Sequence, residues 1–180
     1  MALKKPKPLG RDALMSYAAQ TLASRALSVA ELRTRLRRRA ENPDDIDEVV
    51  AYMKENGYVS DQRFANAYTE WRRDNQGFGK ARVLRDLLAR RVAPSLAKEA
   101  VEEAFEKVDE TKMIEDFLAR KYRGKDLGAL LKQEKHLASA YRRLRTAGFS
   151  SGTSIRVLKR YAAQAEQLEG MEEPGGEAEG

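Results

Sequence analysis

The sequence contains no cysteine and a single histidine, His136, among its 180 residues. The absence of cysteine excludes disulfides, Cys-ligated zinc, iron–sulfur clusters and thiol catalysis. One histidine leaves no His-rich metal site and little scope for His-based acid–base chemistry. Apolar runs fall well short of the roughly 20 residues that a bilayer-spanning helix needs, and the charged start is not followed by the apolar stretch of a signal peptide. We therefore expect a soluble cytoplasmic protein that is not an enzyme and uses no metal, cofactor or membrane.

Proline is also scarce, with 5 in the chain, while apolar residues recur at steps of three and four, the period of an amphipathic helix. Start and stop signals agree with this period, because Ser28 and Glu31 have capping-box spacing and Gly57 suits a left-handed helix end. The fold class is therefore predicted to be all-α. Nine helices are expected, with apolar positions at Leu14, Ala18 and Leu22; Leu32 and Leu36; Ile46, Val49, Val50 and Met53; Phe64, Tyr68 and Trp71; Leu84, Leu87 and Leu88; Ala97, Ala100, Val101, Ala104 and Phe105; Ile114, Phe117 and Leu118; Leu137, Tyr141 and Leu144; and Ile155, Leu158 and Ala162.

The nine expected helices group into three sets of three. The pair Leu32 and Leu36 has a counterpart in Leu84 and Leu88, and the apolar pattern of 46–53 returns in 97–104. A period near 50 residues is typical of stacked helical modules that cannot bury their apolar faces alone. The sequence thus predicts three tandem three-helix repeats in an elongated, curved array. The expected boundaries are a flexible basic N-terminus at 1–10, repeats at 11–57, 58–108 and 109–165, and a disordered acidic tail at 166–180.

Charge alternates in sign along the chain, although the whole carries a formal charge of +6. Residues 1–40 carry a net +8 and residues 41–61 a net −6. The alternation continues with +5 over 62–93, −5 over 94–116, +10 over 117–160 and −6 over 161–180. Segregated charges of both signs suit a protein partner that itself carries both, with nucleic acid attached, better than they suit DNA alone.

The densest basic run lies in residues 33–39, which contain five arginines. Like charges one helical turn apart repel, and phosphate relieves that repulsion because a guanidinium binds it with two parallel hydrogen bonds. This favours a polyanion or an acidic partner. The alternative is a solvated helical surface whose arginines pair with the acidic helices of the same chain.

No catalytic motif is complete in the sequence. The run Gly77–Lys80 lacks the earlier glycine of a phosphate loop, and Ala81 replaces its Ser/Thr. The stretch Gly148–Ser154 is interpreted as a turn and helix N-cap rather than a phosphate cradle. His136 has no catalytic context, and the acidic clusters lack a metal-binding loop. The aromatic residues are expected in the core, with Phe78, between two glycines, as the exception that could stack on a base.

Three motifs together resemble the RecX family of bacterial recombinase regulators over roughly residues 12–160. They read Ala23-x-Arg25-x-x-Ser28-x-x-Glu31-Leu32-x-x-x-Leu36, Gly57-Tyr58-Val59-x-Asp61-x-Arg63-Phe64-Ala65-x-x-Tyr68 and Gly77-x-x-Lys80-x-Arg82-Val83-x-x-x-Leu87. The resemblance implies a non-enzymatic protein that lies in the groove of RecA filaments on single-stranded DNA. It also implies restraint of filament growth, ATP hydrolysis, strand exchange and co-protease activity.

Two residue sets follow from these observations. Filament or DNA binding is expected from the cationic residues Arg33, Arg35, Arg37, Arg38, Arg39, Arg72, Arg73, Lys80, Arg82, Arg85, Arg90, Arg91, Arg142, Arg143, Arg145, Lys159 and Arg160. Junctions between repeats are expected from Arg25, Gly57, Tyr58, Asp61, Arg63 and Phe64. The chain is expected to be a monomer. The alternatives are a stand-alone DNA-binding helical module, such as a transcription regulator, and a structural helical adaptor.

Overall fold

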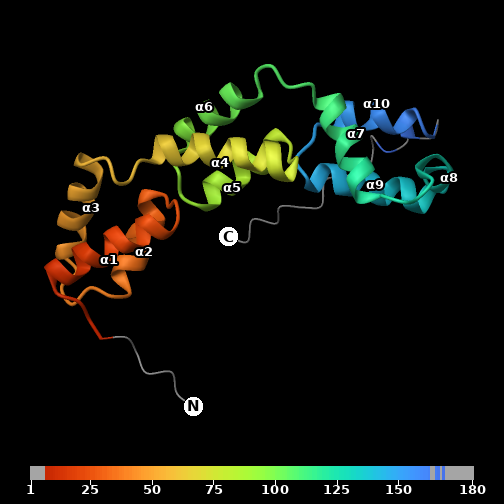
Figure 1. The fold of residues 1–180 in the computed structure, drawn as a ribbon. Coiled ribbons are helices and arrows are strands. Elements are labelled where there is room, and N and C mark those ends of the chain that lie inside the picture. The colour runs from red at the N-terminus through yellow and green to blue at the C-terminus, as the bar shows by residue number, and fades with distance from the viewer. Residues whose placement is uncertain (1–6, 163–164, 167, 169–180) are drawn as a thin grey trace, which may run out of the picture. The chain divides into compact units, whose positions relative to one another are not determined.

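The computed structural model describes residues 7–162, 165, 166 and 168. These residues form an all-α fold, as predicted (Figure 1). Within them, the helices are α1 (Arg11–Ser24), α2 (Val29–Arg37), α3 (Asp45–Glu55), α4 (Asp61–Gln76), α5 (Lys80–Ala89), α6 (Pro94–Phe105), α7 (Glu110–Lys121), α8 (Leu127–Leu131), α9 (Glu134–Thr146) and α10 (Ser151–Lys159).

The chain divides into two compact units. Unit 1 comprises Met1–Tyr68 and Asp86–Ala100, and unit 2 comprises Thr69–Arg85 and Val101–Gly180. The dividing line runs within α4, α5 and α6. The boundaries of the three expected repeats, and their elongated array, stay predictions.

Unit 1 contains a core in which α1, α2 and α3 pack against one another. Leucines from α1 and α2 meet the apolar face of α3, and Leu14, Leu32, Leu36 and Val49 are fully buried. The predicted start of α2 is confirmed, because Ser28 and Glu31 form a capping box. The predicted end of α3 is confirmed too, since Gly57 adopts a left-handed φ of 70°.

Unit 2 contains a second core, in which α10 packs on α7 and α9 and α8 packs on α9. Its largest buried side chains come from all of these helices and the turn before α10, and they include Ile114, Leu131, Leu144, Phe149 and Leu158. Helix α8 has no counterpart among the nine predicted helices. It spans five residues and includes a glycine, so periodicity over such a short stretch carries no signal. Its one local marker is the N-cap Asp126, which accepts a hydrogen bond from the Ala129 amide.

The turn between α9 and α10 lies in direct backbone contact with the loop before α5, within unit 2. The Gly79 amide donates to the Ala147 carbonyl at 2.9 Å, and the Ala81 amide donates to the Gly148 carbonyl at 3.2 Å. Gly148 has a φ of 91°, and a Cβ on it would lie 2.2 Å from the Arg82 nitrogen. Glycine is therefore required in this turn for both its backbone conformation and the space it leaves.

The interpretation of Gly148–Ser154 as a turn and N-cap is confirmed. Ser150 caps α10 by accepting a hydrogen bond from the Thr153 amide. The Glu110 carboxylate already occupies this helix start, because it accepts hydrogen bonds from the Ser150 amide at 2.7 Å and the Ser150 hydroxyl at 2.6 Å. Burial acts to raise the pKa of Glu110, but the hydrogen bonds from Ser150 and Thr153 and the charge of Lys80 outweigh it, so the pKa is lowered.

Glu110→Gln should destabilise the protein by about 1 kcal/mol at neutral pH, since one charge-assisted hydrogen bond at a half-exposed site is lost. A lowered pKa contributes stability that is complete above the ordinary carboxyl pKa of 4.5 and is lost as the pH falls through the folded-state value. Urea unfolding from pH 7 down to pH values below about 4 should therefore show the two proteins converging. A constant gap across that range would contradict this role for Glu110.

Three aromatic residues expected in the core are instead exposed. The exposed fractions are 45% for Tyr52, 59% for Tyr58 and 49% for Trp71. Tyr52 lies off the buried stripe of α3, and its ring stacks on that of Tyr58 with centroids 6.5 Å apart. The core prediction is wrong for these three residues and holds for Phe64, which is buried.

The expected flexible segment 1–10 has one fixed point within the described residues. Leu9 pairs with Ala40 in an isolated bridge, with its amide 2.6 Å from the Arg39 carbonyl. Residues 1–6, and nearly all of the acidic tail predicted at 166–180, lie outside the described residues.

Candidate functional site

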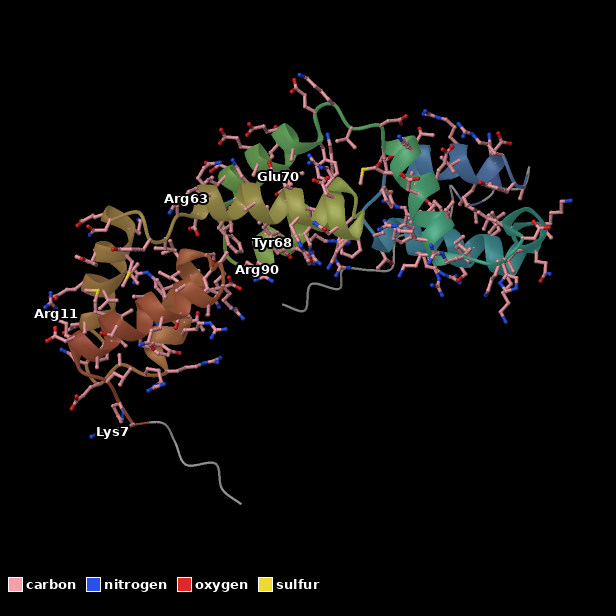
Figure 2. All side chains as sticks on the ribbon, viewed as in Figure 1. Lys7, Arg11, Arg63, Tyr68, Glu70 and Arg90 are labelled. Carbon is pink, nitrogen blue, oxygen red and sulfur yellow. The ribbon has the colours of Figure 1, made fainter. Side chains whose placement is uncertain are left out.

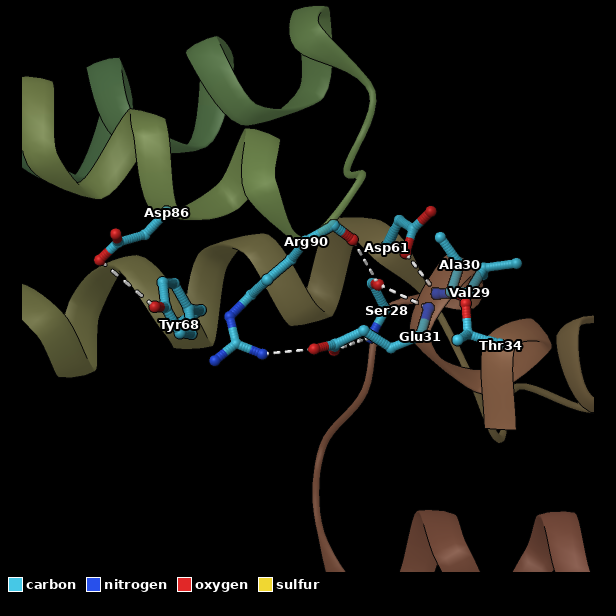
Figure 3. Close-up of polar contacts among 9 residues, drawn as sticks. All are labelled: Ser28, Val29, Ala30, Glu31, Thr34, Asp61, Tyr68, Asp86 and Arg90. Atoms are coloured by element: carbon cyan, nitrogen blue, oxygen red, sulfur yellow. Dashed lines mark hydrogen bonds and ion pairs between the residues drawn. The ribbon is translucent and has the colours of Figure 1, made fainter. Parts of the chain in front are cut away.

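A polar network in unit 1 joins the start of α2 to the start of α4 and the end of α5 (Figure 3). The buried Ser28 hydroxyl accepts from the Glu31 amide at 3.1 Å and donates to the Arg90 carbonyl at 2.8 Å. The Asp61 carboxylate accepts from the Val29 amide, also at 2.8 Å. Residues distant in sequence are thereby fixed to one capping box.

Arg90 is the central cation of this network. Its guanidinium donates to the Glu31 carboxylate at 2.5 Å, and its Cζ lies 4.8 Å from the ring centroid of Tyr68 and 5.9 Å from that of Phe64. Burial acts to lower the pKa of Arg90, but hydrogen bonding to Tyr68 and the charge of Glu31 raise it overall. Figure 2 shows Arg90 beside Tyr68, with Arg63 on the opposite side of α4. The Arg90 side chain is therefore both charged and held in place.

Arg90 forms part of a cavity of about 320 Å³ that we call the arginine pocket. Five guanidinium side chains line it, and Glu31 is the one carboxylate among the lining residues; the arginines are Arg25, Arg35, Arg38, Arg90 and Arg91. Four of these arginines were predicted from the sequence as binding residues, and Arg25 as a junction residue. The sequence contains no signal that the five converge, because they come from three separate stretches of chain.

The basic run of α2 divides into paired and available arginines. Arg33 forms an ion pair with Asp47 of α3, which is the intramolecular pairing that the alternative interpretation expected. The Cζ of Arg39 lies 4.9 Å from the ring centroid of Tyr17. Arg37 and Arg38 are exposed, and neither forms an ion pair within the part of the chain that the structure describes. These two arginines are thus open to a partner, and the half-buried Arg35, which also has no ion pair among the described residues, lines the arginine pocket.

Unit 2 has a cationic cavity of its own, of about 360 Å³. Its apolar walls include Phe78 and Phe117, and its cationic lining comprises Arg82, Lys121, Arg142 and Arg143. Phe78 is half-buried, with the guanidinium groups of Arg72 and Arg82 at 4.9 and 5.3 Å from its ring centroid. The structure thus joins Arg82 to the predicted pair Arg142 and Arg143. Lys121 was missed, and its one signal was its place in the strongly basic segment 117–160.

The other predicted cations have partners within the chain. Lys159 and Arg160 form ion pairs with Glu166 and Glu115. Four arginines donate hydrogen bonds: Arg72 to Gln76, Arg73 to Asp74 and the Ala104 carbonyl, Arg85 to the Thr146 carbonyl, and Arg145 to the Phe149 carbonyl. The charge of Lys80 acts on Glu110. The binding role of each stays a prediction.

The predicted junction residues lie at the connection between α3 and α4, apart from Arg25. Arg63 donates to the carbonyl of Gly57, Asp61 binds α2 through Val29, and Phe64 is buried beneath Arg90. Tyr58 is exposed and contacts Tyr52. These contacts are consistent with a role in the geometry of the connection.

In the described ranges, no group of three or more His, Cys, Asp or Glu side chains comes together in a way that could hold a metal ion. None of the helices in those ranges has the length and apolar character needed to cross a membrane.

Comparison with known proteins supplies the family. The family model for RecX, second three-helix domain, matches residues 60–101. The regulatory protein RecX of Deinococcus radiodurans is 34% identical over 152 residues, which cover 84% of this chain and 70% of that protein. The chain belongs to the RecX family. The regulatory protein RecX of Chromohalobacter salexigens is likewise 34% identical, over 68% of this chain and 80% of its own length.

Solved RecX structures share the fold. The crystal structure of RecX from Lactobacillus salivarius superposes with a TM-score of 0.62, covering 84% of this chain and 96% of that one at 16% identity. A second crystal structure, of a regulatory protein RecX, gives a TM-score of 0.61 at 13% identity, covering 82% of this chain and 72% of that one. The matches to the family model and to the Deinococcus relative confirm the resemblance inferred from the three motifs, and the solved structures confirm the helical fold that it implied.

Proposed function

We propose that this chain is a non-enzymatic regulator of the RecA recombinase that acts in the cytoplasm by binding RecA filaments on single-stranded DNA. Bound in the filament groove, it restrains ATP hydrolysis, strand exchange and co-protease activity, and so modulates DNA repair and recombination. The observation that carries this proposal is membership of the RecX family, whose curated relatives are named regulatory proteins.

The charge distribution supports a nucleoprotein partner. Each unit offers a cationic cavity, lined by five arginines in unit 1 and by three arginines and a lysine in unit 2. DNA in a filament presents one phosphate per nucleotide, and neutralising phosphates releases counterions and drives binding. The acidic helices α3 and α6 alternate with basic stretches along the sequence, which favours a partner with both signs of charge over bare DNA.

Two cationic units on one chain favour multivalent binding to a repeating polymer. Once one unit is bound, the other engages at a high effective concentration, so the overall affinity exceeds that of either unit. A polymer with many equivalent sites offers a site to each unit at once, whereas an isolated RecA monomer carries one copy of each site. We therefore expect preference for the assembled filament over the free recombinase.

Co-sedimentation tests this proposal against its two alternatives. The chain should pellet with RecA filaments formed on single-stranded DNA and stay in the supernatant with RecA that lacks DNA and nucleotide. A stand-alone DNA-binding module would instead bind duplex DNA tightly with no recombinase present, with a steep dependence on salt. A structural adaptor would respond to neither, and either of these results would overturn the proposal.

A further inference from the structure

Arg91 has a backbone conformation that arginine rarely adopts. Its φ is 58°, in the left-handed region, and it is the single non-glycine residue with positive φ among those described. It lies just after α5, in the turn where the Val92 amide donates a hydrogen bond to the Leu87 carbonyl at 3.2 Å. The other positive-φ positions, including those after α3, α4 and α9, are all glycines. Arginine therefore stands where this protein otherwise uses glycine, at a conformational cost.

The backbone hydrogen bonds of this turn, from the Arg91 amide to the Leu88 carbonyl and from the Val92 amide to the Leu87 carbonyl, form equally well with glycine, so they do not explain why arginine stands here. The Arg91 side chain is exposed, and the described residues supply it with no hydrogen bond or ion pair. Strained residues of this kind cluster at functional sites, where the side chain is needed in a particular place. The place in this case is the arginine pocket, which Arg91 lines.

The arginine pocket has a large excess of positive charge. Glu31 is already engaged by Arg90 and by the Ser28 amide, so it neutralises only part of the field. The side chains of Arg25, Arg35, Arg38 and Arg91 have no ion-pair partner among the described residues. Converging guanidinium groups repel one another in the absence of an anion, and phosphate satisfies them with paired hydrogen bonds.

We propose that the arginine pocket binds a backbone phosphate of single-stranded DNA and that arginine is kept at position 91 to complete that site. A concave cavity of about 320 Å³ accepts a phosphate that projects from a flexible strand. Duplex DNA holds its phosphates on a stiff, convex surface with a persistence length of about 50 nm, which enters such a cavity poorly. This site rests on the proposed function, because the bound strand is taken to be the single-stranded DNA inside the RecA filament.

Arg91→Gly separates the structural from the binding role of this residue. Glycine relieves the left-handed strain, which exceeds the entropic cost of glycine in the unfolded chain, so the melting temperature should rise by about 2 to 4 °C. The same change should weaken binding of a fluorescent oligothymidine several-fold and reduce the slope of log K against log[salt] by about 0.7, the value for one lost phosphate contact on a single strand. Arg91→Gln should weaken binding equally without the gain in stability.

Lys54→Gln is the matched control. Lys54 is an exposed cation of the same unit that lies outside the pocket, so its loss changes net charge by the same amount. It should leave both affinity and salt slope close to those of the parent chain. Equal weakening by Lys54→Gln and Arg91→Gly, or parent-like binding by Arg91→Gly, would overturn the site. Equal affinity for a duplex of the same length would overturn the choice of a single strand.

The oligothymidine assay contains no recombinase, so the two proposals fail separately. If the parent chain inhibits RecA but Arg91→Gly binds the strand as tightly as the parent, the proposed phosphate site is wrong and the proposed regulation of RecA stands. If the parent chain binds the strand through Arg91 but does not inhibit RecA, the proposed regulation of RecA is wrong and the proposed phosphate site stands.

Discussion

Replacing Gly148 by alanine should destabilise the protein by about 3 to 4 kcal/mol, because overpacking against backbone costs about 1–3 kcal/mol and a left-handed backbone about 1–2 kcal/mol more. The new Cβ would lie 2.2 Å from the Arg82 nitrogen and 2.8 Å from the Gly79 carbonyl oxygen. Backbone atoms cannot rotate away as a flexible side chain can. The contact between the loop before α5 and the turn before α10 must therefore open.

Substitutions at two other glycines measure the conformational and steric contributions to this loss of stability separately. Gly57 has a φ of 70° and nothing within 4 Å of its would-be Cβ, so Gly57→Ala should cost only the conformational strain of about 1–2 kcal/mol. Gly152 lies in α10 with open space around it and an ordinary φ, so Gly152→Ala should stabilise the protein by about 0.5–1 kcal/mol. Urea unfolding measures all three. Equal losses for Gly148→Ala and Gly57→Ala would show that the close approach has no energetic weight.

Reversing the charge of Arg37, the last residue of α2, and of Arg38, which follows it as the C-cap, should remove most of the affinity for RecA filaments. Each exchange of Arg37 or Arg38 for glutamate replaces attraction by repulsion, worth about 1 kcal/mol at an exposed site, so the pair should weaken binding about 30-fold. Arg39 is left unchanged because it stacks on Tyr17, and its reversal would disturb the fold. Co-sedimentation with filaments measures the loss.

The matched control removes the same charge elsewhere. Lys112 and Lys125 are exposed lysines of unit 2 that line neither cationic cavity, and their double exchange for glutamate changes net charge equally. That control should retain filament binding, and both variants should keep the helical circular dichroism spectrum of the parent chain. Equal losses in the two variants would mean that overall charge, rather than the surface around α2, determines binding.

Local sequence signals predicted most of the helices because helix formation depends on neighbours a few residues apart. The apolar stripes of α2 and α3 match their buried residues, and the Ser28–Glu31 spacing formed the expected capping box. Helix α8 was beyond this reasoning, since five residues do not complete two turns. Tyr52 and Tyr58 were misplaced because aromatic residues usually lie in cores, whereas these two stack on each other at the surface.

The candidate site was predictable in composition but not in geometry. A run of five arginines indicated a cationic surface, and the structure leaves Arg37 and Arg38 exposed on it. The arginine pocket depends on long-range packing that brings α2 to the end of α5, which no single stretch of sequence reports. The left-handed conformation of Arg91 was likewise hidden, because sequence patterns lead one to expect glycine at such a helix end.

If this chain restrains RecA through its cationic surfaces, as proposed, it should slow DNA-dependent ATP hydrolysis by RecA. The parent chain should slow hydrolysis on single-stranded DNA in a dose-dependent manner. The Arg37→Glu, Arg38→Glu variant should require about 30 times more protein for the same effect, and the Lys112→Glu, Lys125→Glu variant should inhibit like the parent. Undiminished hydrolysis at a saturating concentration of the parent chain would show that it does not restrain RecA, and full inhibition by the arginine variant would show that Arg37 and Arg38 have no part in the restraint.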